Sequence, residues 1–184
     1  MIKVTIDDLS TAYRYLYPRH TILITSGTLE NPSALAIAWS TPLSADPPLI
    51  GFSITKKRYS YDIIKASAEF VINIPEFNQI DETYYVGSVS GFEEPDKIEK
   101  AGFNLEASSH IKAPRIAECK INLECKLKDI LKTGDHELFI GQVINIAIDP
   151  TIMDSFSVNL NEFRPIYWRR SKNKDDTFQL KRKN

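Results

Sequence analysis

The chain has 184 residues, a length that suits one domain of ordinary size. Its 23 Lys and Arg residues nearly balance 24 Asp and Glu residues, which excludes the strong basic excess of a dedicated nucleic-acid-binding protein. The first ten residues lack the apolar core of a signal peptide, and no window has the length of a transmembrane helix. We therefore expect a cytoplasmic protein that binds neither nucleic acid nor a membrane.

We expect a single domain over residues 1–168 and a solvated basic C-terminal tail over residues 169–184, where apolar residues are few. The two cysteines, Cys119 and Cys125, would lie about 20 Å apart on one strand, too far for a disulfide. Their spacing fits no zinc pattern, and the three histidines are scattered. The sequence thus predicts reduced thiols and no metal site.

Strand signals dominate the chain, because β-branched and aromatic residues gather in short runs bounded by Gly, Pro or Asn. In the long run at 117–131, apolar residues from Ile121 to Leu127 alternate with polar ones such as Asn122 and Glu124, which we expect to face solvent. The predicted strands are 21–26, 35–39, 49–55, 70–74, 117–131 and 138–147.

Helical signals are short, and they fall at 7–15, 61–67, 79–85 and 95–101. Strands outnumber helices and mostly follow one another, which favours a mainly β fold: an antiparallel barrel, closed or partly open, with short α helices. The regular strand–helix alternation of a doubly wound sheet is missing. The G-x-G-x-x-G fingerprint is missing too.

Two polar segments flank the third predicted strand. The first, 40–44, is a loop rich in hydroxyls; the second carries Arg58 beside Ser60, which stands where the N-cap of the next helix is expected. An arginine and a helix N-terminus together can bind a phosphate. On spacing alone, the alternatives are a turn that satisfies its own backbone and a capped helix after a solvated basic turn.

Several motifs occur in an ordered succession over about residues 16–148. They are Asp46-Pro47-Pro48, the FVINIP run at 70–75, Ser90-Gly91 with Asp96-Lys97, the APRIAEC run at 113–119 and the GDHELFIG run at 134–141. In this succession the chain resembles the flavin reductase-like FMN-binding split-barrel family, the flavoredoxin group in particular.

The resemblance implies an FMN-binding split β-barrel of Greek-key antiparallel type that works as a homodimer. It implies that the loop after the second strand lines the flavin ring and ribityl chain, and that the basic turn holds the phosphate. The expected FMN-binding residues are Asn31, Trp39, Ser40, Thr41, Pro42, Leu43, Ser44, Lys57, Arg58, Ser60 and Tyr61.

His136 follows a tight turn at the start of a predicted strand. A lone histidine is more often structural, but the resemblance places this one near the flavin or the incoming nicotinamide, as the candidate catalytic residue. The implied activity is NAD(P)H-dependent flavin reduction, with NADH or NADPH as co-substrate and hydride transfer to flavin N5. A downstream electron-acceptor protein would be a separate chain. The alternatives are a flavoredoxin-like electron carrier with tightly bound FMN and no direct NAD(P)H oxidation, and a flavin-free binding module.

Overall fold

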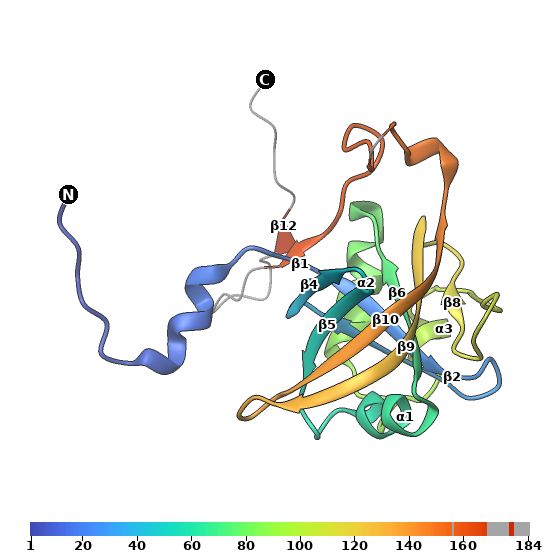
Figure 1. Cartoon of the computed structure of the whole chain (residues 1–184), viewed down its shortest axis with the longest axis horizontal. Coiled ribbons are helices and arrows are strands. Elements are labelled where there is room, and N and C mark those ends of the chain that lie inside the picture. Colours follow the sequence, from blue (N-terminus) through green and yellow to red (C-terminus); the bar gives the residue numbers. More distant parts are fainter. Residues whose placement is uncertain (156, 169–176, 179–184) are drawn as a thin grey trace.

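A computed structural model describes residues 1–155, 157–168 and 177–178 of the chain (Figure 1). Its centre is a seven-stranded antiparallel sheet in the order β3-β2-β6-β9-β10-β5-β4. Strand β3 also contacts β5, although four strands separate them in the sheet, so the sheet coils into a partly open barrel. The strands are β2 (Ile22–Gly27), β3 (Pro32–Ile37), β4 (Ser40–Ala45), β5 (Pro48–Ile54), β6 (Glu69–Ile74), β9 (Ile121–Lys132) and β10 (Glu137–Ile148).

Two small sheets and several short helices complete the fold, which confirms the mainly β prediction. A three-stranded sheet joins β1 (Arg19–His20), β11 (Tyr167–Trp168) and β12 (Thr177–Phe178), and a two-stranded one joins β7 (Leu105–Glu106) and β8 (Arg115–Ile116). The α-helices are α1 (Tyr59–Ser67), α2 (Ile80–Ser88) and α3 (Lys97–Lys100). The 3-10 helices are η1 (Leu9–Leu16), η2 (Phe77–Gln79) and η3 (Pro150–Ile152).

Three phenylalanines form the centre of the barrel core. The rings of Phe52 and Phe70 meet edge to face with centroids 5.2 Å apart, and Phe139 lies 5.6 Å from Phe52. All three side chains are fully buried. A Cβ atom at Gly141 would overlap the ring of Phe70, so only glycine leaves room for this arrangement on β10.

The segment 40–44 is not a loop, as the sequence predicted, but most of the edge strand β4, which pairs with β5 from Ser40↔Phe52 to Ala45↔Pro48. An edge strand bonds on one side only, so it tolerates Pro42 and solvent-facing hydroxyls. Helix α1 begins earlier than predicted, and its N-cap is Arg58 rather than Ser60. Ser60 is the second helical residue, and its hydroxyl meets that of Ser33 at 2.6 Å.

Strand β9 starts later than predicted, at Ile121, and both of its faces are covered over its first half. Asn122 and Glu124, which we expected in solvent, are 5% and 1% exposed. Asn122 donates to Asn73 Oδ1, and Glu124 accepts the N–H groups of 109 and 110. Glu124 is therefore bound by backbone groups of a distant loop and Asn122 by a side chain of β6, and strand alternation reveals neither partner.

The remaining expectations concern the cysteines, the tail and membranes. Cys119 and Cys125 are free and buried, and burial raises the pKa of the Cys125 thiol to about 12. Within the predicted tail, Thr177–Phe178 pairs with β11; the rest of 169–184 lies outside the described residues. In the described part of the chain, no helix has the length and apolar character needed to cross a membrane.

Candidate functional site

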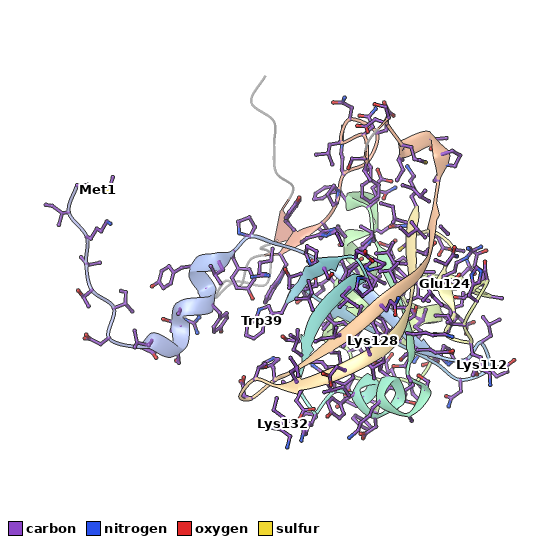
Figure 2. All side chains as sticks on the ribbon, in the orientation of Figure 1. Met1, Trp39, Lys112, Glu124, Lys128 and Lys132 are labelled. Carbon is purple, nitrogen blue, oxygen red and sulfur yellow. The ribbon has the colours of Figure 1, made fainter. Side chains whose placement is uncertain are left out.

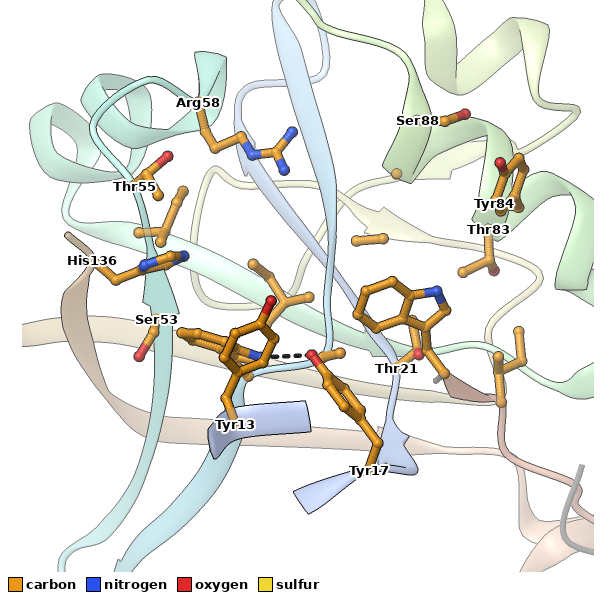
Figure 3. A pocket seen from close by; sticks show the side chains of 18 of the residues that line it. Tyr13, Tyr17, Thr21, Ser53, Thr55, Arg58, Thr83, Tyr84, Ser88 and His136 are labelled. Carbon is orange, nitrogen blue, oxygen red and sulfur yellow. Dashed lines mark hydrogen bonds between the residues drawn. The ribbon is translucent and has the colours of Figure 1, made fainter. Parts of the chain in front are cut away.

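A pocket of about 420 Å³ lies between α2, the ends of β3 and β5, and the segments on either side of β1. Figure 3 shows side chains from these elements converging on it. Three predicted site residues line it: Trp39, Arg58 and His136. The other lining residues are Tyr13, Tyr17, Thr21, Ala36, Ile37, Ala38, Ser53, Ile54, Thr55, Ile80, Thr83, Tyr84, Gly87, Ser88, Asp135, Ile166 and Trp168.

Trp39 is the most firmly held side chain of the pocket. Its indole Nε1 donates a hydrogen bond to the hydroxyl of Tyr17 at 2.9 Å, drawn as a dashed line in Figure 3. The ring of Tyr13 lies 5.3 Å from it, and the imidazole of His136 lies 4.7 Å away at a tilt of 33°. The indole is thus fixed as one wall of the site.

Arg19 holds the backbone on both sides of Trp39. Its Nε donates to the carbonyl of Ala38 at 3.1 Å, and its Nη2 donates to the carbonyl of Ser40 at 3.3 Å. These bonds span the bend between β3 and β4, where the chain leaves one strand for the next. The wall is therefore fixed through its backbone as well as through its ring.

Two buried hydroxyls of the pocket lack a hydrogen-bond partner among the described residues. Thr21 is 7% exposed and Thr83 is 3% exposed, and both Oγ1 atoms are unsatisfied. A buried polar group without a partner costs about 1–3 kcal/mol, so native structures seldom keep one unless something else satisfies it. These two hydroxyls are therefore suited to bind polar groups of a ligand.

Charged groups lie at two places around the pocket. Arg58 and Ser88 lie at the same end in Figure 3. The buried Lys97 donates to carbonyls of α2 and of the residue after it. Elsewhere, His136 Nδ1 lies 2.8 Å from Asp135 Oδ1. Hydrogen bonding and charge attraction from this imidazole lower the pKa of the Asp135 carboxyl.

Other predicted residues lie outside this pocket. Ser40 and Thr41 line a second pocket of about 270 Å³, which shares Tyr13, Trp39 and Ser53 with the first. Further along the same edge strand follow Pro42, Leu43 and Ser44, which line neither pocket.

Four more predicted residues are not brought to the pocket. Asn31 and Lys57 are exposed. Ser60 is 2% exposed and engaged with Ser33, so it does not cap α1 for an anion. Tyr61 is a core residue whose hydroxyl donates to Glu137, and this bond raises the pKa of Tyr61 to about 12. Neither hydroxyl points to a ligand.

Sequence reasoning missed most of the pocket's polar and aromatic lining. Tyr13 and Tyr17 follow the four-residue spacing of one helix face, which was the only available signal. The threonines at 21 and 83 come from different elements, and nothing in the sequence marks their hydroxyls as unpartnered. As for metals, the described residues contain no group of three or more His, Cys, Asp or Glu that could hold one.

The chain matches the family of the flavin reductase like domain over residues 13–174. The chain belongs to this family. An uncharacterised protein of Archaeoglobus fulgidus is 39% identical over 133 residues, which cover 72% of this chain and 74% of that protein. Reductase subunit HsaB of a flavin-dependent monooxygenase from Mycobacterium tuberculosis is 27% identical over 156 residues, 80% of each chain.

Solved structures of this family share the fold. Flavoredoxin from Methanosarcina acetivorans has a TM-score of 0.85 at 20% identity, covering 100% of this chain and 94% of that one. Nitrilotriacetate monooxygenase component B from Bacillus cereus has a TM-score of 0.84 at 20% identity, covering 100% and 98%. The split-barrel architecture expected from the sequence is therefore that of the family.

Proposed function

We propose that the 420 Å³ pocket binds FMN and that the protein is an NAD(P)H-dependent flavin oxidoreductase. The observation that carries this proposal is the pair of unpartnered hydroxyls, Thr21 and Thr83, in a pocket with one aromatic wall and a cation at one end. Because the chain belongs to the flavin reductase family, we take flavin as the ligand that this lining suits.

FMN makes three demands that the lining residues meet. Its phosphate needs a cation, which Arg58 supplies with a planar fork suited to phosphate oxygens. Its ribityl hydroxyls and ring carbonyls need hydrogen-bond partners, which the pocket offers in Thr21, Thr83 and Ser53. Its ring needs a flat apolar wall, and Trp39 provides one. The residues present therefore fit the cofactor.

The protein's part in the reaction is positioning and electrostatics. Trp39, Arg58, Thr21 and Thr83 would hold FMN, which would supply hydride-accepting chemistry at N5 with NADH or NADPH as the donor. Trp39 orients the ring plane because its indole is hydrogen-bonded and its backbone is clamped. His136 lies against that indole, where it would meet the nicotinamide side. The reaction requires no further acid or base from the protein.

The name of the relative in Mycobacterium tuberculosis supports the reductase role. That relative is the reductase subunit of a flavin-dependent monooxygenase, and we propose that this chain likewise passes electrons to a separate acceptor protein. We also propose a cytoplasmic homodimer. Ser40 and Thr41, in the second pocket across Trp39, are proposed to contact the part of the flavin that extends past that wall.

An absorbance spectrum of the purified protein tests the proposal, followed by NADH and then NADPH under anaerobic conditions. We expect a flavin absorbance band at about 450 nm, and we expect one of the two nucleotides to bleach it. A band that neither nucleotide bleaches would overturn the reductase and favour an electron carrier. No band, with none regained after adding FMN, would overturn flavin binding itself and leave a flavin-free module.

A further inference from the structure

Lys97, the first residue of α3, is a buried cation that the proposed mechanism has not yet used. Its side chain is 5% exposed. The ammonium donates one hydrogen bond to the carbonyl of Val86 and one to that of Val89, both at 2.8 Å. Burying an ammonium is costly unless charge and hydrogen bonds compensate it, and two neutral carbonyls supply only the second.

No carboxylate within the described residues lies within 4.0 Å of this ammonium. Two acidic residues close to it in sequence, Glu94 and Asp96, instead bind Lys100, each at 3.2 Å. Burial, and after it the like charge of Arg58, lowers the pKa of Lys97 to about 8. Among the described residues neither Lys97 nor Arg58 forms an ion pair, so these two mutually repelling cations have no counter-ion there.

The position of these cations connects them to the pocket. The carbonyls that Lys97 binds belong to the residues on either side of Gly87 and Ser88, which line the pocket. Arg58 lies at the same end of the pocket (Figure 3). The start of α1 and the loop before α3 are also packed together, because a Cβ at Gly91 would overlap the ring of Tyr59.

We propose that Lys97 is a positioning residue for the phosphate of the flavin, which it attracts together with Arg58 from behind the Gly87–Ser88 wall. The phosphate dianion is the counter-ion that the pair lacks. Arg58 contacts it, while Lys97 adds a fixed positive field and holds the end of α2 in place. This inference rests on the proposed function and deepens it, because it assigns the ligand's phosphate to one end of the pocket.

The test compares FMN with riboflavin, which has the same ring and ribityl chain but no phosphate. Lys97→Gln replaces the ammonium by an uncharged amide, whose N–H groups can donate to the same carbonyls. We expect its affinity for FMN to fall about tenfold or more while its affinity for riboflavin changes less than about twofold. Lys100→Met, which removes a nearby lysine that has its own carboxylates, is the matched control and should leave both affinities unchanged.

An equal loss for both flavins would overturn the inference, because it would show that Lys97 only supports the fold of α2. Unchanged affinity for FMN would overturn it as well. If Lys97→Gln does not fold, Lys97→Met provides the same comparison, since its apolar chain suits a buried position. A wild-type protein that binds FMN no better than riboflavin would overturn this inference alone, whereas a wild-type protein that binds neither would overturn the proposed function.

Discussion

Arg58 is the residue on which the proposed phosphate contact depends. Replacing it with alanine should weaken FMN binding by roughly 1.5–3 kcal/mol, the usual worth of a hydrogen bond to a charged group. Flavin fluorescence titration measures this change. Lys57→Ala is the matched control, because it removes an adjacent exposed cation that does not line the pocket. Equal losses for the two variants would show that only the general charge of the turn matters.

A substitution at Thr83 should affect FMN binding and protein stability in opposite directions. Its hydroxyl has no partner among the described residues, so Thr83→Val removes an unsatisfied buried group and keeps the shape of the side chain. We expect the flavin-free protein to be as stable as the wild type or more stable, and FMN binding to weaken by about 0.5–1.5 kcal/mol. Urea denaturation and flavin titration check the two parts. A less stable variant would mean that the hydroxyl is satisfied within the fold.

Lys97 should also make stability depend on pH in a predictable direction. Its pKa is about 8 in the folded protein, below its ordinary value of 10.5. Between these values the unfolded chain holds the extra proton, so the stability that Lys97 contributes rises as pH rises from about 8 to 10.5. Below pH 8 both states are protonated, and the cost of burying the charge is fully present.

Urea denaturation of the flavin-free protein at several pH values measures this effect as the difference between wild type and Lys97→Met. The difference should shift in favour of the wild type with rising pH. Lys100→Met is the control, because hydrogen bonds to carboxylates raise the pKa of Lys100, so its contribution is still present up to its ordinary pKa of 10.5 and is lost only above it. A difference that stays flat for Lys97 would contradict the prediction.

Among the elements, β10 depends most on one small residue. Gly141→Ala would drive a methyl group into the ring of Phe70, which is fully buried against Phe52. Overpacking of this kind costs about 1–3 kcal/mol of unfolding free energy. Denaturation in urea measures it, and Gln142→Ala on the same strand is the control.

Phe70→Leu in the Gly141→Ala background should recover part of that loss, because the smaller side chain leaves room for the new methyl group. Strictly additive effects of the two changes would show that the methyl group is accommodated somewhere else. An unchanged denaturation midpoint for Gly141→Ala alone would have the same meaning.

The elements also show what the sequence could and could not predict. Runs of β-branched residues located most of the long strands, because such residues suit a pleated, half-buried surface. The segment 40–44 was predicted as a loop, because proline and hydroxyls are typical of turns, yet an edge strand tolerates both. The role of Ser60 as N-cap was wrong because α1 begins two residues earlier than predicted, at Tyr59.

The candidate site was predictable only where charge or aromatic character marks a residue. Trp39, Arg58 and His136 were predicted and do line one pocket. Thr21 and Thr83 were not, because lacking a partner is a property of three-dimensional packing rather than of residue type. The burial of Glu124 was missed for the same reason. Its backbone partners come from a loop, and the alternation of residues along its own strand cannot reveal them.

For the whole molecule, the N-terminal arm, residues 1–8, is the candidate contact surface of the proposed homodimer. Figure 1 shows it projecting away from the barrel, and Figure 2 places Met1 far from the sheet and Trp39 on the side that faces the arm. Its large apolar side chains are exposed, among them Ile2 at 97% and Val4 at 81%. Apolar surface of this kind usually marks an interaction site, and closed pairs are the commonest oligomers.

We therefore expect size-exclusion chromatography with light scattering to give twice the mass of one chain, and deletion of residues 1–8 to shift the protein toward monomer. Ile146→Ser is the control, because this residue is 61% exposed on β10 and does not belong to the arm. If Ile146→Ser gives monomer and the deletion does not, the interface lies on the sheet. A monomeric wild type would contradict the homodimer.

Since the arm continues into η1, whose Tyr13 lines the pocket, a dimer held by the arm should also bind FMN more tightly than the truncated monomer.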